Sequence, residues 1–319
     1  MIKSVLTFLF ALAVTFCFAQ KNTVAGTVND KQGKPIPFAF IKDARHNYAT
    51  FSDPNGSFTL LVDTLDRLLV TAFNFKESVI KITDPQNVNV VLANDDIKGV
   101  KAVTSNESFK ETLSTEGITR ADAGATGYIA KENSIHGSRY LFDDWVHGFV
   151  ITSADTIRQN DNYLFNYQKM DNSLVFTDGD NKMKEIPRGT IKTFTLFDDK
   201  GQSYMFADVP AIDQKHYVQV LSGGSKYVLY KQFNTKYLPN DYVSNGMTSS
   251  GHNYDEFKDD PAYYVVSLPG GQPQKVLFKN KSIKQVFAAD INKVNKYLSE
   301  HDNDVDESYL ADLVSTLNN

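Results

Sequence analysis

Three short runs of sequence decide the fold of the N-terminal part. They are VAGTVND at residues 24–30, GKPIPFAFI at 33–41 and TFSDPNGSFTL at 50–60. Apolar and polar residues alternate in the first run and again at the end of the third, which is the period of a half-buried β-strand. The Asn55-Gly56 pair predicts a tight turn, because both residue types tolerate positive φ. The runs therefore predict short antiparallel strands.

Further apolar runs extend this pattern along the chain. They lie at residues 57–62, 68–73, 79–82 and 88–92. Each run is short and is bounded by turn-forming residues, as expected of strands rather than helices. Six or seven such strands joined by turns predict a small β-sandwich over residues 22–93.

The order of these motifs resembles the carboxypeptidase regulatory-like domain. The matching motifs are Gly-Thr-Val-x-Asp at 26–30, Gly-Lys-Pro-Ile-Pro-Phe-Ala at 33–39, Ser-Asp-x-x-Gly-Ser-Phe at 52–58 and Val-x-Leu at 90–92. The resemblance implies a transthyretin-like, Ig-like seven-stranded sandwich. It also implies a non-catalytic accessory or docking module in the envelope of a Bacteroidetes-type bacterium. The chain departs from the family at residues 73–75, where Phe-Asn-Phe replaces the usual Gly-Tyr pair.

The histidines do not predict a zinc peptidase. Such an enzyme needs a His with a Glu three residues later, and a second His far downstream. No histidine of this chain has a Glu at that spacing, although His252 and His301 are followed by Asp255 and Asp304 there. Both histidines lie in polar, irregular sequence, which is typical of surface side chains.

The amino-acid composition limits the classes of protein to which the chain can belong. The chain has 319 residues, enough for about two domains. Hydrophobic residues make up 41%, so a core can form, and the formal charge is −5. Without a basic excess, binding to nucleic acid is not expected. No sequence motif predicts a cofactor.

The N-terminus predicts export. Residues 1–19 combine Lys3 with an apolar run at 5–16 and small residues before a cleavage point near Ala19. The run is shorter than the roughly 20 residues of a membrane-spanning helix, so cleavage is favoured over a retained anchor. Acylation of Cys17, the only cysteine, is the alternative, but Phe16 is bulky for a lipobox. We expect a mature chain without a transmembrane segment, in the periplasm, at the outer membrane or secreted.

Beyond the sandwich, the sequence predicts a linker and then a second β region. Residues 94–138 are rich in small and polar types, as in a linker. From residue 139 to 280, aromatic-rich alternation and close turns predict an antiparallel meander, as a curled sheet or open barrel. The predicted strands lie at 145–152, 163–167, 174–176, 183–186, 193–197, 204–206, 217–221, 227–233, 263–268 and 275–278.

Two segments do not follow the meander. Residues 239–260 have no clear period, which indicates either an ordered functional loop or, the favoured reading, a mobile insertion. Residues 281–319 change to helical spacing, with apolar stripes at 283–298 and 309–317. They predict a helical hairpin packed on the sheet, with Asp306 as a cap. A membrane-surface helix is the alternative, but the polar faces mix both charges.

No grouping of reactive side chains is convincing as a site. Members of a catalytic triad meet across a fold, so neighbours in sequence are weak evidence for one. Adjacent carboxylates on a strand lack the separation that glycosidases need. The calcium pattern fails because Glu307 and Leu313 replace the turn glycine and the bidentate Glu. The groupings are Ser249 with His252 and Asp255, Asp143 and Asp144 beside Trp145, and Asp302 with Asp304 and Asp306.

The sequence thus predicts no catalytic, cofactor-binding or metal-binding residue. The leading hypothesis is a non-catalytic envelope protein that acts as a binding or docking module, with an envelope protein or a glycan as partner. One alternative is a hydrolase of glycan or peptide with a site near residues 239–260. Another is an accessory to outer-membrane nutrient uptake.

Overall fold

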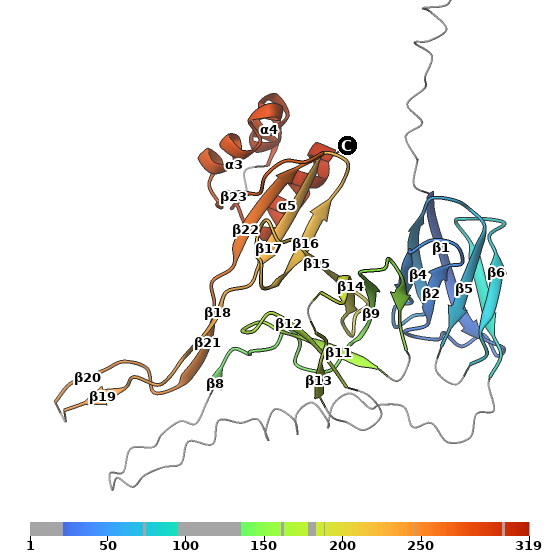
Figure 1. Ribbon diagram of the computed structural model, residues 1–319, viewed down its shortest axis with the longest axis horizontal. Coiled ribbons are helices and arrows are strands. Elements are labelled where there is room, and N and C mark those ends of the chain that lie inside the picture. Colours follow the sequence, from blue (N-terminus) through green and yellow to red (C-terminus); the bar gives the residue numbers. More distant parts are fainter. Residues whose placement is uncertain are drawn as a thin grey trace, which may run out of the picture. The chain divides into compact units, whose positions relative to one another are not determined.

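The chain folds into two compact units, Met1–Ile97 and Lys98–Asn319, in a computed structural model (Figure 1). It is mainly β with a helical C-terminal part, as the sequence predicts. The predicted signal peptide and nearly all of the predicted linker lie outside the described residues. The structure describes residues 22–72, 75–94, 135–160, 163–177, 183–187, 189–245, 247–301 and 304–318.

The first unit is a β-sandwich, which confirms the predicted fold. Its strands form one sheet in the order β4-β1-β7 and a second in the order β3-β2-β5-β6. Val28, Ile41, Leu60 and Val70 come from both sheets and share one buried core, so the sheets pack face to face. The strands are β1 (Asn22–Asp30), β2 (Phe40–Asp43), β3 (Ala49–Phe51), β4 (Ser57–Val62), β5 (Arg67–Thr71), β6 (Ser78–Lys81) and β7 (Val88–Leu92).

Two local features explain why this sequence forms the sandwich. Gly26 lets β1 approach β7, because a Cβ there would lie 2.1 Å from a carbonyl oxygen of β7. In the predicted tight turn, Asp53 Oδ1 accepts hydrogen bonds from the backbone N–H groups of Asn55 and Ser57, each at 2.8 Å. Gly56 completes the turn with φ of 75°, a conformation that other residues adopt only with strain.

The second unit is built on an eight-stranded antiparallel sheet, called the main sheet here. Its order is β10-β9-β14-β15-β16-β17-β22-β23, so among the described strands β10 and β23 are the outer ones and the sheet does not close. From β14 onward it is the predicted meander. The strands in spatial order are β10 (Ile157–Arg158), β9 (His147–Thr152), β14 (Ile191–Phe197), β15 (Ser203–Asp208), β16 (Tyr217–Gly223), β17 (Tyr227–Gln232), β22 (Ala262–Ser267) and β23 (Gln274–Val276).

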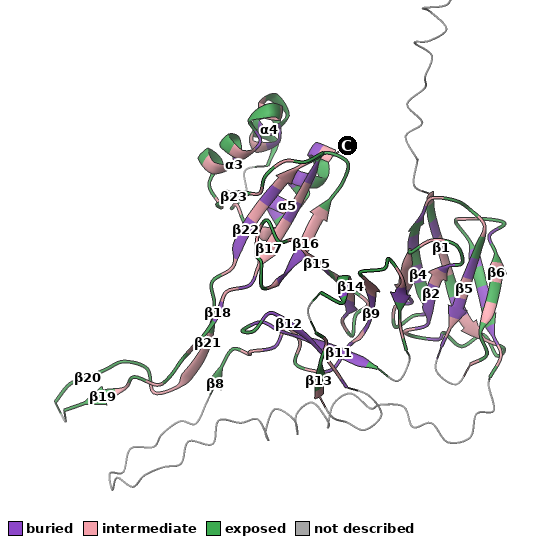
Figure 2. Ribbon diagram, in the orientation of Figure 1, coloured by how far each residue is buried: buried purple, intermediate pink, exposed green. Residues whose placement is uncertain are grey.

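Three strands that the sequence placed in the meander form a separate layer. β11 (Leu164–Gln168), β12 (Ser173–Thr177) and β13 (Met183–Glu185) make their own sheet, called the small sheet here. Every residue of β11 is buried, because both faces of the strand are covered (Figure 2). A single meander is therefore the wrong prediction for these strands, since they cover the main sheet instead of extending it.

One face of the main sheet carries a continuous row of side chains in register. The small sheet covers the row near β9, β14 and β15, and the helices cover it near β17, β22 and β23. Polar Gln219 and Lys231 separate the two cores, and Lys231 pairs with Glu307 at 2.7 Å. The row consists of Arg158, Val150, Phe194, Phe206, Gln219, Lys231, Tyr263 and Val276.

The C-terminal helices are α3 (Asn280–Val286), η1 (Ala288–Asp290), α4 (Ile291–Glu300) and α5 (Glu307–Asn318). The helix predicted from the stripe at 283–298 is interrupted at Phe287, whose fully buried ring packs edge-on against Tyr227. Asp306 caps α5, as predicted, because its Oδ1 accepts a 2.8 Å bond from the Tyr309 N–H. No helix in the described part of the chain is long and apolar enough to cross a bilayer.

Residues 235–245 and 247–259 form a β-hairpin arm that continues β17 and β22 away from the main sheet (Figure 1). The segment 239–260, predicted as a mobile insertion or an ordered functional loop, therefore holds three of the four strands of this arm. Periodicity did not predict the strands at the tip because both faces of the tip are exposed, so apolar and polar residues do not alternate along them. The arm consists of β18 (Thr235–Leu238), β19 (Val243–Ser244), β20 (Ser249–Ser250) and β21 (Asp255–Asp259), and β8 (Ile135–His136) pairs with β21.

Candidate functional site

An open pocket of about 570 Å³ lies at the margin of the core between the main sheet and the small sheet. That volume is within the range of small-molecule sites, roughly 300–1,000 Å³. The lining is predominantly apolar, with polar groups at the rim. The lining residues are Val150, Arg158, Gln159, Asn160, Tyr163, Phe165, Phe176, Lys184, Glu185, Ile186 and Pro187.

The small sheet supplies one wall through a register row. Phe165 pairs with Phe176, and Phe176 pairs with Lys184. Directly opposed residues on antiparallel strands project from the same face, so Lys184 stands beside the two rings on the pocket side. Glu185 pairs with Val175 and projects from the other face, since side chains alternate along a strand. Among the described residues of this wall, Lys184 therefore lies on the same face of the small sheet as the two rings, and Glu185 lies on the other.

The main sheet supplies the opposing wall. Val150 on β9 is buried and pairs with Arg158 on the edge strand β10, so both side chains project from the same face. Arg158 is exposed, and no described side chain forms an ion pair or hydrogen bond with it. Each wall thus has apolar side chains toward the core and a cationic side chain on its outer strand.

Aromatic rings form a corner of the pocket. The ring centroids of Tyr163 and Phe176 are 5.3 Å apart, and those of Phe165 and Phe176 are 6.3 Å apart. Phe165 is buried whereas Tyr163 is 37% exposed, so the rings run from the core to the surface. Such tilted aromatic contacts stabilise an apolar wall that a ligand can also contact.

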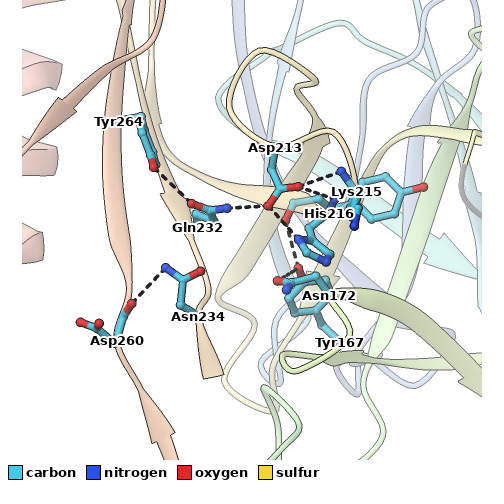
Figure 3. Close-up of polar contacts among 10 residues, drawn as sticks. Tyr167, Asn172, Asp213, Lys215, His216, Gln232, Asn234, Asp260 and Tyr264 are labelled. Atoms are coloured by element: carbon cyan, nitrogen blue, oxygen red, sulfur yellow. Dashed lines mark hydrogen bonds and ion pairs between the residues drawn. The ribbon is translucent and has the colours of Figure 1, made fainter. Parts of the chain in front are cut away.

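A polar network beside β16, β17 and β22 is the second cluster of interest (Figure 3). Asp213 Oδ2 lies 2.7 Å from His216 Nδ1 and also accepts a bond from Gln232 Nε2. Gln232 Oε1 accepts a 3.3 Å bond from the Tyr264 hydroxyl. Burial raises the pKa of Asp213, but hydrogen bonds from the Lys215 N–H, His216 and Gln232 outweigh it and hold the pKa below its usual range.

The sandwich contains the same Asp–His arrangement, which indicates a structural role. Asp43 Oδ1 accepts bonds from the backbone N–H groups of Arg45 and His46, and Oδ2 lies 2.9 Å from His46 Nδ1. Asp213 makes the equivalent contacts with Lys215 and His216. Recurrence in two different folds is typical of a turn motif in which an aspartate organises the following backbone.

The Ser249, His252 and Asp255 grouping lies on the arm, not in the pocket. The side chain of His252 is 65% exposed and is 3.6 Å from Asp241 Oδ1. Asp255 accepts bonds from the Tyr237 hydroxyl and the Asn240 N–H, both at 2.7 Å. These partners hold the hairpin together.

The other two groupings do not contribute to the pocket lining. Trp145 is 3% exposed in a core cluster with Tyr140, so its ring is not presented to a sugar. Asp302 lies outside the described residues, and Asp306 caps α5. Among the residues that the structure describes, no three His, Cys, Asp or Glu side chains gather as metal ligands.

Of the histidines, His252 and His301 lie at the surface, as predicted. His147 differs, because it begins β9 and burial lowers its pKa to about 4. His136 stacks on Tyr254, with ring centroids 3.8 Å apart. The pocket itself was missed by the sequence analysis, since only the strand register brings Lys184 and Arg158 to its two walls.

Comparison with protein-family models finds no match to the chain, and comparison with curated proteins finds none either. The likeness of residues 22–93 to the carboxypeptidase regulatory-like domain therefore stays a prediction. The function is inferred below from the geometry of the pocket.

Proposed function

We propose that the protein is a non-catalytic binding protein of the cell envelope, and that its second unit binds a small molecule in the pocket. The observation that carries this proposal is the open apolar pocket between two sheets, with Val150, Phe165 and Phe176 on its walls. Transfer of apolar surface into such a site provides roughly 25 cal/mol per Å² buried. The rigid strands on both sides present these side chains without a large conformational change.

The sandwich has a different role in this proposal. Its resemblance to an accessory domain supports docking to an envelope partner, and the predicted signal peptide supports export. Its core is self-contained, as a module that carries or positions another unit requires. Location in the periplasm, at the outer membrane or outside the cell follows from the same resemblance.

The binding role is favoured over the alternative hydrolase by where the candidate catalytic residues lie. A hydrolase site near residues 239–260 requires His252 or Asp255 to converge on a pocket. His252 is instead largely exposed on the arm, and Asp255 bonds to Tyr237 and Asn240 of the same hairpin. The pocket walls carry aromatic and aliphatic side chains.

Titration with the neutral fluorophore N-phenylnaphthylamine tests the proposal. Saturable fluorescence enhancement is expected with the full chain. Phe176→Ala should weaken binding about tenfold, because a lost aromatic contact is worth about 1 kcal/mol or more.

The matched control is Phe278→Ala, because Phe278 is half-buried in the separate helical core. It should leave the affinity unchanged, and circular dichroism should show both variants folded. Equal affinity of the wild type and a folded Phe176→Ala variant would contradict the proposed site.

A further inference from the structure

We infer that the pocket also receives an extended peptide segment of a partner protein, which pairs with the outer edge of β13 and places apolar side chains into the pocket. This inference rests on the proposed function, because it uses the same pocket, and it adds the kind of partner. It is carried by the difference between the two edges of the small sheet. Another segment of the chain covers one edge, and none in the described part of the chain covers the other.

The edge of β11 is covered by residues 140–146. Phe165 and Val146 exchange two backbone hydrogen bonds, of 2.8 and 2.9 Å, and the Leu141 N–H donates to the Tyr167 carbonyl oxygen at 2.9 Å. The Val146 side chain is only 7% exposed and belongs to the core between the two sheets. At this edge, an extended segment thus satisfies the backbone groups of the strand and adds an apolar side chain to the core.

The edge of β13 has unsatisfied backbone groups. The Ile186 N–H donates to the Leu174 carbonyl oxygen on the β12 side at 3.0 Å. Backbone groups alternate in direction along a strand, so those of Lys184 also point toward β12, and those of Met183 and Glu185 point away from it. In the described part of the chain, no residue bonds to the outward N–H and C=O groups of Met183 and Glu185. An added strand would supply their partners.

This edge borders the pocket, so an added strand would present side chains to it. A residue opposite Lys184 would project from the face that carries Phe176 and Phe165, because paired residues share a face. Ile186 also lines the pocket, so a residue opposite it would project the same way. The peptide that fits therefore has apolar residues at every second position. Strand addition obtains affinity from main-chain bonds and specificity from such alternate side chains.

Pro187 limits the length of the pairing. It has no N–H to donate, and its carbonyl oxygen accepts a 2.6 Å bond from the Thr190 hydroxyl. Within sheets, proline is confined to edges because it cannot donate to a ladder. We therefore expect the peptide to pair with residues 183–186 and not beyond.

The test uses the full chain and an acetylated, amidated peptide of sequence Lys-Thr-Val-Thr-Val-Thr-Lys. The peptide should displace N-phenylnaphthylamine, because its valine side chains enter the pocket. Calorimetry measures its affinity directly. Replacement of both valines by serine should weaken binding about tenfold or more, because buried apolar surface is lost.

N-methylation of the peptide separates strand pairing from burial of side chains. With the valines on the pocket face, the N–H of the central threonine points to β13 and the valine N–H groups point away. N-methylation of the central threonine should therefore weaken binding about tenfold, whereas N-methylation of a valine should leave the affinity unchanged. Equal effects of the two modifications would overturn the inference.

Two variants at one position test the edge of the protein. Glu185→Pro removes an outward N–H without removing a bond to β12, and should weaken peptide binding about tenfold. Glu185→Ala is the matched control, because it removes the carboxylate and keeps the N–H, and it should bind the peptide as the wild type does. Circular dichroism should show both variants folded. Equal losses in the two folded variants would contradict pairing through this N–H.

The outcomes separate this inference from the proposed function. Saturable binding of the fluorophore to the wild type, with no displacement by the peptide, would overturn the peptide partner and leave the binding function standing. Binding of neither the fluorophore nor the peptide, in a folded protein, would remove both.

Discussion

His147 is a residue whose ionisation the fold alters, and it makes stability depend on pH. Burial lowers its pKa to about 4 from the ordinary 6.5. Between these values the unfolded chain binds a proton that the folded chain does not, so acid favours unfolding. The stability that the neutral imidazole provides is complete above pH 6.5 and is lost as the pH falls toward 4.

Replacement of His147 by Gln should flatten this part of the pH profile. The wild type should lose up to about 3 kcal/mol of unfolding free energy between pH 7 and pH 4 through this group, and His147→Gln should lose less by that amount. Urea denaturation at several pH values measures it. At pH 7.5, where the imidazole is neutral in both states, the comparison gives the packing cost alone. Parallel pH profiles would show that His147 is not the responsible group.

Single residues were predictable where their role is local. Asp53, Gly56 and Asp306 act within four positions of themselves, so their turn and cap could be read from the sequence. Arg158 and Lys184 could not, because their role depends on which strand pairs with which. The sequence also gave no indication that Glu185, adjacent to Lys184, would project from the opposite face, since β13 is too short to show a period.

The α5 cap offers a test at the level of secondary-structure elements. Asp306→Ala should lower the free energy of unfolding of the second unit by about 1 kcal/mol, because the Tyr309 N–H loses its acceptor. Asp304→Ala is the matched control, since Asp304 is also an exposed aspartate two residues earlier in the chain. Denaturant titration measures both.

The same pair of variants distinguishes a cap from a calcium site. A cap predicts a loss for Asp306→Ala only, and no change in either protein when calcium is added. Equal losses from both variants, with stabilisation of the wild type by calcium, would contradict the cap as the main role of Asp306.

Elements with tight turns and one buried face were predictable, and others were not. The hairpin of β14 and β15 was found because Asp198 and Gly201 form a turn between alternating strands. The tip of the arm was missed because neither of its faces is buried. The first C-terminal helix was predicted as continuous, since an apolar stripe does not reveal that α3 ends at Val286 and that the 3-10 helix η1 separates it from α4. Tertiary contacts decided these cases.

Each unit has its own core, so the whole molecule should unfold in two steps. Ile41→Ala should destabilise the first unit alone, and Leu174→Ala the second alone, each by about 2–5 kcal/mol. Trp145 is the only tryptophan and lies in the second unit, so its fluorescence follows that unit selectively. Far-ultraviolet circular dichroism follows both units.

The control is to follow each variant by the signal that reports on the other unit. Ile41→Ala should leave the tryptophan transition unchanged while it shifts the circular dichroism curve. A shift of the tryptophan transition by Ile41→Ala would show that the units unfold together. At this level the sequence predicted the sandwich and the second β region, because a change in composition separates them. It did not predict the two layers of the second unit.

The parallel pairing of β1 with β7 has a mechanical consequence. Gly26 pairs with Val88 and Asp30 with Leu92, so the chain enters the sandwich at one end of this sheet and leaves at the other. With a rise of roughly 3.3 Å per residue, entry and exit are about 25 Å apart along the strands. Tension between Asn22 and Leu92 would therefore shear all the β1–β7 hydrogen bonds at once and not peel them singly. The sandwich should therefore resist tension applied along the chain. Single-molecule pulling should record its unfolding as one abrupt rupture.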